Sequence, residues 1–166
     1  MAISSTIKTI IPYIKEAGNY VKMMISSQAV KMNDGKDLET TITELNNKLT
    51  DSGWVNCTMG DGIKAYNNDI INVPKVRKIG NVVYLKGVVE NTTTWQVHET
   101  FLKIPEGYRP SYKCVFVMQG SGSCRYNITA LSDGRIIADR YTNNTTMNQT
   151  VPVGSWLNMY CSWIIN

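Results

Sequence analysis

The chain of 166 residues has one histidine, His98, which is the natural starting point for acid–base chemistry. It lies in the strand-like sequence QVHETF and lacks the HxH or HExxH spacing of metal-binding histidines. Ser121, in the sequence GSGSC, is not surrounded by the GxSxG pattern of a nucleophile elbow. The sequence therefore predicts no nucleophilic catalysis, no metal ion and no cofactor, and we expect a structural or surface role for His98.

Pairs of carboxylates offer a second kind of chemistry, the hydrolysis of a glycosidic bond. That reaction needs two carboxyl groups about 5 to 10 Å apart. The carboxylates available for such a pair lie far from one another in the sequence: Glu90, Glu99, Asp133 and Asp139. No spacing indicates which two would meet. We expect a protein that is not an enzyme, and keep a hydrolase of surface polysaccharide as an alternative.

Aromatic side chains in predicted loops are the residues best suited to bind a ligand. Ring faces stack on the C–H surfaces of sugars or pack against a protein partner, and a neighbouring arginine adds a charged hydrogen-bond donor. For Tyr108, in EGYRP, the alternative is that the ring only packs on its own hairpin. The candidate ligand-binding residues are Trp95, Tyr108, Arg109, Tyr112, Tyr126, Arg140 and Tyr141.

Composition favours a β-structured protein that works outside a cell. Hydrophobic residues make up 43% of the chain, which is enough for a core. Charged residues make up only 18%, against about a quarter in typical proteins. The net charge of +4 is spread over isolated residues apart from KVRK at Lys75–Lys78. No pattern of an RNA-binding sheet, zinc finger or recognition helix is present, so we expect no nucleic-acid partner.

The N-terminal sequence predicts neither a signal peptide nor a membrane span. Charged residues interrupt every apolar run of the first 27 residues, and no segment reaches the roughly 18 apolar residues that a span requires. The four cysteines, Cys57, Cys114, Cys124 and Cys161, form no CxxC pair, and we expect free thiols.

Two stretches of heptad-like spacing precede the β-rich part of the chain. In the first, within residues 1–32, the apolar residues step by three and four, although Pro12 interrupts the run. A stripe this short cannot be buried by its own helix, so we expect an attachment or oligomerisation segment that meets sister chains or a docking protein. Its seam consists of Ile7, Ile10, Ile14, Ala17, Val21 and Met24.

The second stretch, residues 33–51, predicts a short coiled coil. It follows the turn sequence NDGKD, in which Asp37 is placed to cap a helix. Two heptads are marginal alone, and their pattern leaves the number of strands open, while the isoleucine-rich first seam favours trimers. The second seam consists of Leu38, Ile42, Leu45 and Leu49.

Residues 52–166 predict an antiparallel β-sandwich, because short strand-like runs alternate with turn sequences such as GDG, GSGS and SDG. Both faces of the last strand carry aromatic residues, so we expect one face against the core and the other against another chain. The predicted strands are 55–59, 75–79, 82–89, 96–104, 113–118, 125–131, 135–141 and 156–165.

Several phrases of this region occur in a familiar order: SGWVNCTMGDGIKAY, PKVRKIGNVVYLKGVV, LKIPEGYRPSYKCVFV, MQGSGSCRYNI, DGRI and GSWLNMYCSW. Together they resemble the C-terminal β-domain of fibre proteins from bacteriophages and prophages of Gram-positive bacteria. The resemblance spans about Ser52 to Asn166. It implies a trimeric β-sandwich head at the tip of a virion fibre, and it implies no catalytic residues.

The short region before the head distinguishes this chain from a long tail fibre, because no repetitive shaft is present. We expect a short, trimeric capsid (head) fibre on the virion surface, attached to other virion proteins by its N-terminal segment. Host cell-wall polysaccharide or teichoic acid is the expected external partner. The alternatives are a tail or baseplate fibre knob that binds a receptor, and a decoration protein whose head binds nothing.

Overall fold

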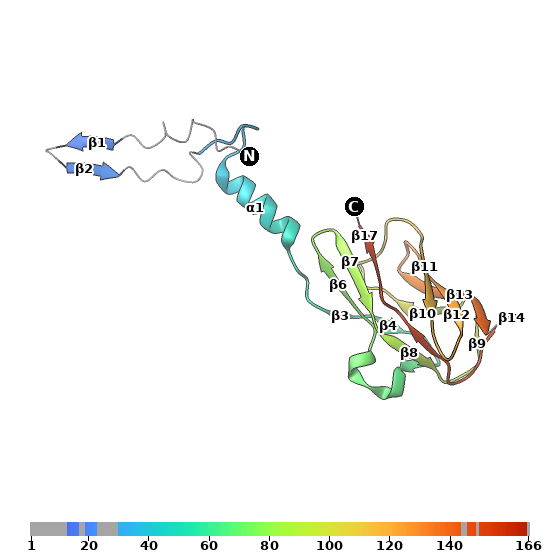
Figure 1. Ribbon diagram of the computed structural model, residues 1–166. Helices are drawn as coiled ribbons and strands as arrows, with labels where there is room; N and C mark the ends of the chain where they lie inside the picture. The colour runs from blue at the N-terminus through green and yellow to red at the C-terminus, as the bar shows by residue number, and fades with distance from the viewer. Residues whose placement is uncertain (1–12, 17–18, 23–29, 144–145, 149, 166) are drawn as a thin grey trace. The chain divides into compact units, whose positions relative to one another are not determined.

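The structure is a computed structural model that describes residues 13–16, 19–22, 30–143, 146–148 and 150–165 (Figure 1). The chain forms two compact units, residues 1–47 and 48–166. The described residues contain one α-helix and many short strands, and their strand pairs are antiparallel. The predicted mostly β fold with an N-terminal helix is therefore confirmed.

The first unit begins with a pair of strands where the sequence predicted a helical seam. β1 (Tyr13–Glu16) pairs with β2 (Asn19–Lys22), and Ile14 is the register partner of Val21. The helix prediction is wrong for these residues. Pro12 is unfavourable inside a helix, and the β-branched and aromatic residues that follow favour strands. The other seam residues, Ile7, Ile10, Ala17 and Met24, lie outside the described residues.

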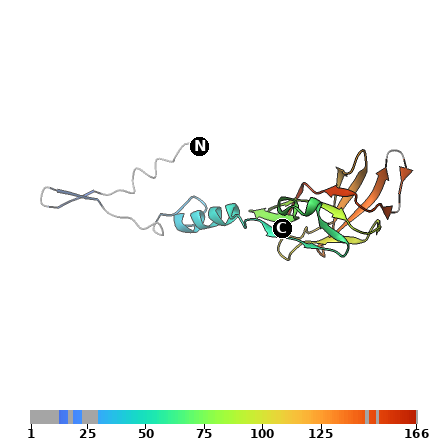
Figure 2. The same ribbon diagram turned by 90° about the horizontal axis from the view of Figure 1, so that it is seen from below.

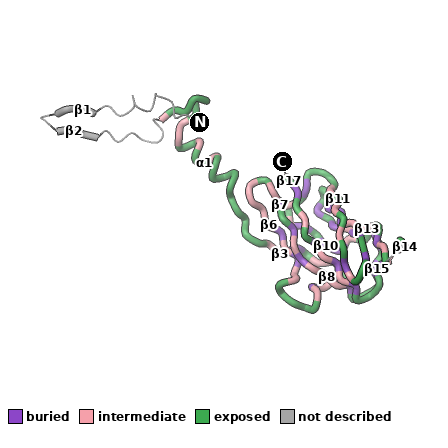
Figure 3. The backbone as a smooth tube through the Cα atoms, in the orientation of Figure 1, coloured by how far each residue is buried: buried purple, intermediate pink, exposed green. Residues whose placement is uncertain are grey.

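The helix predicted from the second seam is confirmed as α1 (Leu38–Leu49). Asp37 caps it, since its Oδ1 accepts the backbone N–H of Thr40 at 2.7 Å. Before the helix, Lys36 Nζ forms an ion pair with Glu44 at 2.6 Å. No residue of α1 is buried, and Figure 3 shows the helix without a buried segment.

The second unit contains four antiparallel sheets. The largest has the order β11-β12-β13-β10-β4, with β14 paired to β13: β4 (Thr58–Met59), β10 (Thr100–Lys103), β11 (Cys114–Gln119), β12 (Arg125–Ala130), β13 (Arg135–Asn143) and β14 (Thr146–Met147). The next has the order β17-β7-β6-β3: β3 (Val55–Asn56), β6 (Lys75–Ile79), β7 (Val82–Lys86) and β17 (Cys161–Ile164).

The two smaller sheets join these larger ones. One has the order β16-β8-β5: β5 (Ile63–Ala65), β8 (Val88–Asn91) and β16 (Trp156–Asn158). The other pairs β15 (Thr150–Val151) with β9 (Trp95–Gln96). Two short 3-10 helices, η3 (Tyr66–Asn68) and η4 (Ile70–Asn72), lead into β6.

A bend at Gly87 divides one predicted strand, 82–89, into β7 and β8. Gly87 has a φ of 152°, and a Cβ at this position would lie 2.6 Å from the Cα of Pro74. Its carbonyl oxygen accepts the N–H of Met159 at 2.8 Å, in the segment that separates β16 from β17. The close approach of Pro74 requires glycine here and directs the chain from one sheet into the next.

One hydrophobic core is shared by all four sheets. Trp95 and Phe101 pack edge to face with their ring centroids 5.3 Å apart. Full burial of such a side chain contributes roughly 1.5 to 3 kcal/mol. The largest fully buried side chains are Tyr126, Tyr141, Phe101, Leu85, Leu102, Ile104, Ile128, Ile136, Leu157 and Met159.

Buried Asn91, at the end of β8, connects its sheet to the β9–β15 pair. Its Nδ2 lies within hydrogen-bonding distance of the carbonyl oxygens of Thr93 (2.9 Å), Val151 (3.0 Å) and Pro152 (2.7 Å). These contacts join the end of β8 to the segments on either side of the β9–β15 pair.

The segment that follows α1 is fastened to the β6–β7 hairpin. Ser52 donates its N–H to the carbonyl of Lys78 at 2.9 Å, and its Oγ accepts the N–H of Lys78 at the same distance. Gly80, at the hairpin turn, donates its N–H to the carbonyl of Thr50 at 3.0 Å. The chain therefore joins the second unit at this hairpin, whereas β14 lies at the opposite end of the unit (Figure 1, Figure 2).

Candidate functional site

Three of the predicted ligand-binding aromatics are core residues. Trp95, Tyr126 and Tyr141 belong to β9, β12 and β13, and all three are buried. Tyr126 donates its hydroxyl to the carbonyl of Asn158 at 2.9 Å, and Tyr141 contacts Cys124 Sγ at 3.1 Å. Burial raises the pKa of both phenols. The prediction that these three rings lie in loops is wrong, and the protein's own side chains cover them.

The other predicted residues lie nearer the surface, in different environments. Tyr108 is half-buried against the core, and its carbonyl oxygen accepts the indole N–H of Trp163 at 2.9 Å. Arg109 donates its Nε to the carbonyl of Ile104 at 3.4 Å. Tyr112 is 76% exposed, and Arg140 is exposed on β13. The seven predicted residues therefore do not form one site.

The exposed aromatic residues that do gather lie on the outer face of the β17-β7-β6-β3 sheet. Trp54, Tyr84 and Tyr160 line a hollow of about 410 Å³ together with Lys86 and other residues. The Nζ of Lys86 lies 4.3 Å from the centre of the Trp54 ring, which is a cation–π distance. We call this surface the aromatic face.

The sequence contains a signal for the aromatic face that the loop-based search missed. Tyr84 alternates with buried Val83 and Leu85 on β7. Tyr160 lies in the predicted strand 156–165, for which the sequence predicted that one face meets another chain without indicating which, and it is 62% exposed. Strand alternation, and not loop position, would have found both residues.

An ion pair borders the aromatic face. The guanidinium of Arg77 binds the carboxylate of Asp51 through both oxygens, with Nε 2.8 Å from Oδ1. This hydrogen bonding, with a further bond from the N–H of Gly53, lowers the pKa of Asp51 to about 2. Arg77 also lies 5.8 Å from the centre of the Trp54 ring. The pair ties the segment that follows α1, which includes Trp54, to β6.

A second candidate surface lies around His98 and Arg140. Two adjoining hollows of about 510 and 410 Å³ share these two residues in their linings. The first hollow also includes Val97, Met147 and Asn148, and the second also includes Lys113, Val115, Asn127 and Asp139. We call the two together the His98–Arg140 hollow.

Unusual backbone conformations place the two shared residues. His98 has a φ of 73° and Arg140 a φ of 52°, in the left-handed region that glycine and asparagine favour. The N–H of His98 donates to the carbonyl of Ala138 at 2.9 Å, which holds the turn after β9 against β13. This bond fixes His98 next to Ala138 of β13, which lies two residues before Arg140.

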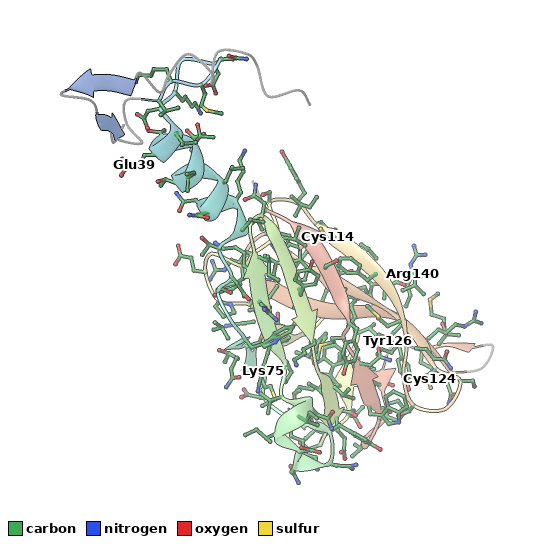
Figure 4. All side chains as sticks on the ribbon, turned by 60° about the vertical axis from the view of Figure 1, so that its left-hand side comes forward. Glu39, Lys75, Cys114, Cys124, Tyr126 and Arg140 are labelled. Atoms are coloured by element: carbon green, nitrogen blue, oxygen red, sulfur yellow. The ribbon has the colours of Figure 1, made fainter. Side chains whose placement is uncertain are left out.

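A β-bulge accounts for the position of Arg140. The register of β12 with β13 pairs Asn127 with Asp139 and then shifts to pair Arg125 with Thr142. One extra residue of β13 is accommodated between these pairs, and such bulges redirect side chains. Tyr141 enters the core, while Figure 4 shows the Arg140 side chain directed away from the sheets.

The hollow contains two cationic side chains for which the described part of the chain provides no ion pair. Among the described residues, the ion pairs involve Lys36, Lys64, Arg77 and Arg135, and neither Lys113 nor Arg140. The acidic residue of the lining, Asp139, accepts the hydroxyl of Thr129 at 3.0 Å. Two cationic side chains in one lining can bind a negatively charged group.

The remaining residues considered for catalysis have other contacts. Glu90 pairs with Lys64 at 3.6 Å, Asp133 pairs with Arg135 at 2.7 Å, and Glu99 accepts the N–H of Gln96 at 3.2 Å. Ser121 Oγ accepts the N–H of Trp156 at 2.7 Å and so fixes its hairpin. Within the described ranges, no three His, Cys, Asp or Glu side chains are grouped closely enough to hold a metal ion.

Comparisons with known proteins identify no relative: no protein-family model matches the sequence, and no curated protein is significantly similar to it. Among the residues that the structure describes, no helix has the length and apolar character to cross a membrane.

Proposed function

We propose that this protein is a short, trimeric fibre on the virion of a bacteriophage of Gram-positive bacteria, attached to the capsid and without enzymatic activity. In this proposal residues 52–166 form a β-sandwich head that contacts the host cell surface. The observation that carries the proposal is that α1 presents an apolar seam although none of its residues is buried. The resemblance of the head sequence to phage fibre domains supplies the biological context.

The exposed seam supports self-association on energetic grounds. An isolated helix of twelve residues is marginal in water, and most helical stability in proteins comes from packing of an apolar face. Ile42, Leu45 and Leu49 are 47%, 52% and 72% exposed. Covering each of these side chains would contribute about 1 kcal/mol. Three copies of α1 around a common axis cover all of them, as a coiled coil does.

The aromatic face supports association of the heads. Ile164 is exposed on β17 and Tyr160 immediately before it, and Trp54 and Tyr84 are further exposed aromatic residues of this surface. Large exposed apolar patches are uncommon on monomeric proteins and usually mark contact surfaces. The segment that follows α1 is fastened to this same sheet. In the proposed trimer the aromatic faces of the heads are the surfaces that contact one another.

A trimeric head explains how a fibre holds its host without a deep site. Linking several weak contacts raises the overall affinity through the effective concentration of the second and third sites. Cell-wall polysaccharide and teichoic acid are repetitive, so each head can meet an equivalent unit. The N-terminal segment is left for attachment to another virion protein.

The proposal is tested by combining a mass measurement with a binding measurement. We expect the purified chain to be a trimer that adsorbs to host cells or isolated cell walls. The variant Leu45→Asp, which places three carboxylates in the seam, should be monomeric and adsorb far more weakly. Thr43→Ala, on another side of α1, is the matched control and should keep both properties.

Other results would select one of the alternatives. A trimer that binds no host material would indicate a decoration protein, and release of reducing ends from cell-wall polysaccharide would indicate a hydrolase. Labelling intact virions with an antibody against the head distinguishes a capsid fibre from a tail or baseplate knob. A monomeric wild-type chain at micromolar concentration would contradict the proposal.

A further inference from the structure

From its geometry and charge we infer that the His98–Arg140 hollow binds a phosphate group within a polyol or sugar phosphate chain. The inference rests on the proposed host-contact role of the head, and adds to it a site and a class of ligand. The inferred ligand is a polymer whose repeating unit carries a negative charge next to hydroxyl groups. A neutral polysaccharide lacks the group that this site is built to recognise.

Charge is the first argument for a phosphate ligand. Lys113 and Arg140 line one continuous depression, and no ion pair with another described residue neutralises either of them. Their elements are separate, since Lys113 immediately precedes β11 and Arg140 lies in the bulge of β13. With Asp139 as the one carboxylate of the same lining, the two cations leave a net positive charge, and bonds from Arg or Lys to phosphate are strong hydrogen bonds.

The rest of the lining indicates what adjoins the phosphate. The amide of Asn127 can donate to or accept from a hydroxyl group, and the carboxylate of Asp139 can accept from one. Val97, Val115 and Met147 provide apolar walls for the C–H surface of a polyol or sugar. The adjoining volumes of about 510 and 410 Å³ exceed the needs of a single free anion. The combination fits a chain in which phosphate alternates with a hydroxylated unit.

Backbone strain provides an independent argument for function at this place. A non-glycine residue in the left-handed region is energetically unfavourable, and such residues are concentrated at functional sites. The bulge requires the left-handed conformation at position 140, but asparagine would adopt it more easily than arginine. The backbone conformation therefore does not explain the arginine, and we attribute its presence to the charge of its side chain. Arg140→Asn is accordingly the most informative variant.

Binding of a fluorescently labelled poly(glycerol phosphate) oligomer to the full-length protein, followed by fluorescence anisotropy, tests the inference. We expect the wild type to bind, and Arg140→Asn and Lys113→Gln each to weaken binding at least about tenfold. Lys75→Gln, on β6, is the matched control and should change the affinity by less than about twofold. Arg140→Asn should also unfold at the same temperature as the wild type or a higher one, because strain is relieved while binding is lost.

Competition experiments identify the recognised chemistry. Unlabelled glycerol 3-phosphate should displace the oligomer, inorganic phosphate should do so at higher concentration, and glycerol should have no effect. The inference is overturned if both hollow variants retain wild-type affinity, or if glycerol competes as well as its phosphate. It is also overturned if a single-stranded DNA oligonucleotide of equal charge binds as tightly, because that would indicate general attraction of polyanions.

Light scattering on the same samples separates this inference from the fibre proposal. If the protein is a trimer but does not bind the oligomer, the fibre proposal is retained and the inferred phosphate site is refuted. If the protein is a monomer that binds the oligomer through Lys113 and Arg140, the inferred site is retained and the trimeric fibre is refuted. Both hollow variants should keep the mass of the wild type, since neither residue belongs to the α1 seam or to the aromatic face.

Discussion

Replacement of Asn91 should destabilise the second unit, because backbone carbonyls lose the hydrogen bonds that its side chain donates. Asn91 is 2% exposed, and its Nδ2 serves the carbonyls of Thr93, Val151 and Pro152. Asn91→Ala removes three hydrogen bonds, each of which contributes about 1 kcal/mol, and one of them lies fully in the interior, at the carbonyl of Val151. Among the described residues the Oδ1 of Asn91 has no hydrogen-bond partner, so its removal recovers part of this cost. We expect a net loss of about 2 to 3 kcal/mol.

Urea unfolding at a fixed protein concentration measures this effect. With a denaturant dependence of about 2 kcal/mol per M, the midpoint of Asn91→Ala should fall by about 1 M. Asn91→Asp should fall further, by more than about 4 kcal/mol, because it places a carboxylate against three carbonyl oxygens. Asn56→Ala, at an exposed position of β3, should change stability by less than about 0.5 kcal/mol. If the aspartate variant were as stable as the wild type, the proposed role of the Nδ2 donor would be wrong.

Three further predictions concern pH, thiol reactivity and the hairpin turn. The pKa of Asp51 is lowered to about 2 by its bond to Arg77. This bond therefore stabilises the fold at a pH above the ordinary carboxyl pKa, and the stabilisation is lost as the pH falls toward 2. The unfolding temperatures of the wild type and of Asp51→Asn should differ at pH 6 and coincide at pH 2. Burial raises the pKa of Cys57 and of Cys161 from 9.0 to about 12. Both thiols should therefore react slowly with iodoacetamide in the folded protein at pH 8, and stability should decline as the pH rises from 9 toward 12. Rapid labelling of Cys57 without denaturant would contradict its burial. In Gly80→Ala the new Cβ would meet the carbonyl oxygen of Lys48 at a φ of 57°, so we expect a loss of about 2 kcal/mol in chemical denaturation, and an unchanged midpoint would argue against this packing.

The positions of many strands along the chain were predictable from the sequence, because the alternation of apolar and polar residues and the turn residues are local signals. The predicted strand 75–79 coincides with β6, and 125–131 and 135–141 correspond closely to β12 and β13. The bend at Gly87 was not predicted, because it depends on the approach of Pro74 from another part of the chain. Strand β5 was missed since Ile63–Ala65 is too short for a visible pattern.

The candidate sites were less predictable than the fold. Tyr126 and Tyr141 contain the chemistry expected of a sugar platform, and only the three-dimensional core shows that they stack on each other, with their ring centroids 6.4 Å apart. Arg140, a predicted ligand-binding residue, is exposed, but Lys113, which lines the same hollow, is 27 positions away in the sequence. The bulge that unites them follows from a shift of strand register, which composition and spacing do not reveal.

The N-terminal error has a different origin. Apolar residues at steps of three and four are compatible with both a helix and a short hairpin when β-branched residues dominate. For Ile14 and Val21, the hairpin places the two residues in register across β1 and β2. The same spacing at Leu38 and Ile42, with a capping aspartate and without proline, does form a helix.

The mass of the full-length protein in solution tests the central claim most directly. Multi-angle light scattering at micromolar concentration should give three times the chain mass of 18.6 kDa, and Leu45→Asp should reduce it to that of one chain. A wild-type mass of 18.6 kDa would show that the seam of α1 and the aromatic face remain open to water, and would contradict the fibre account.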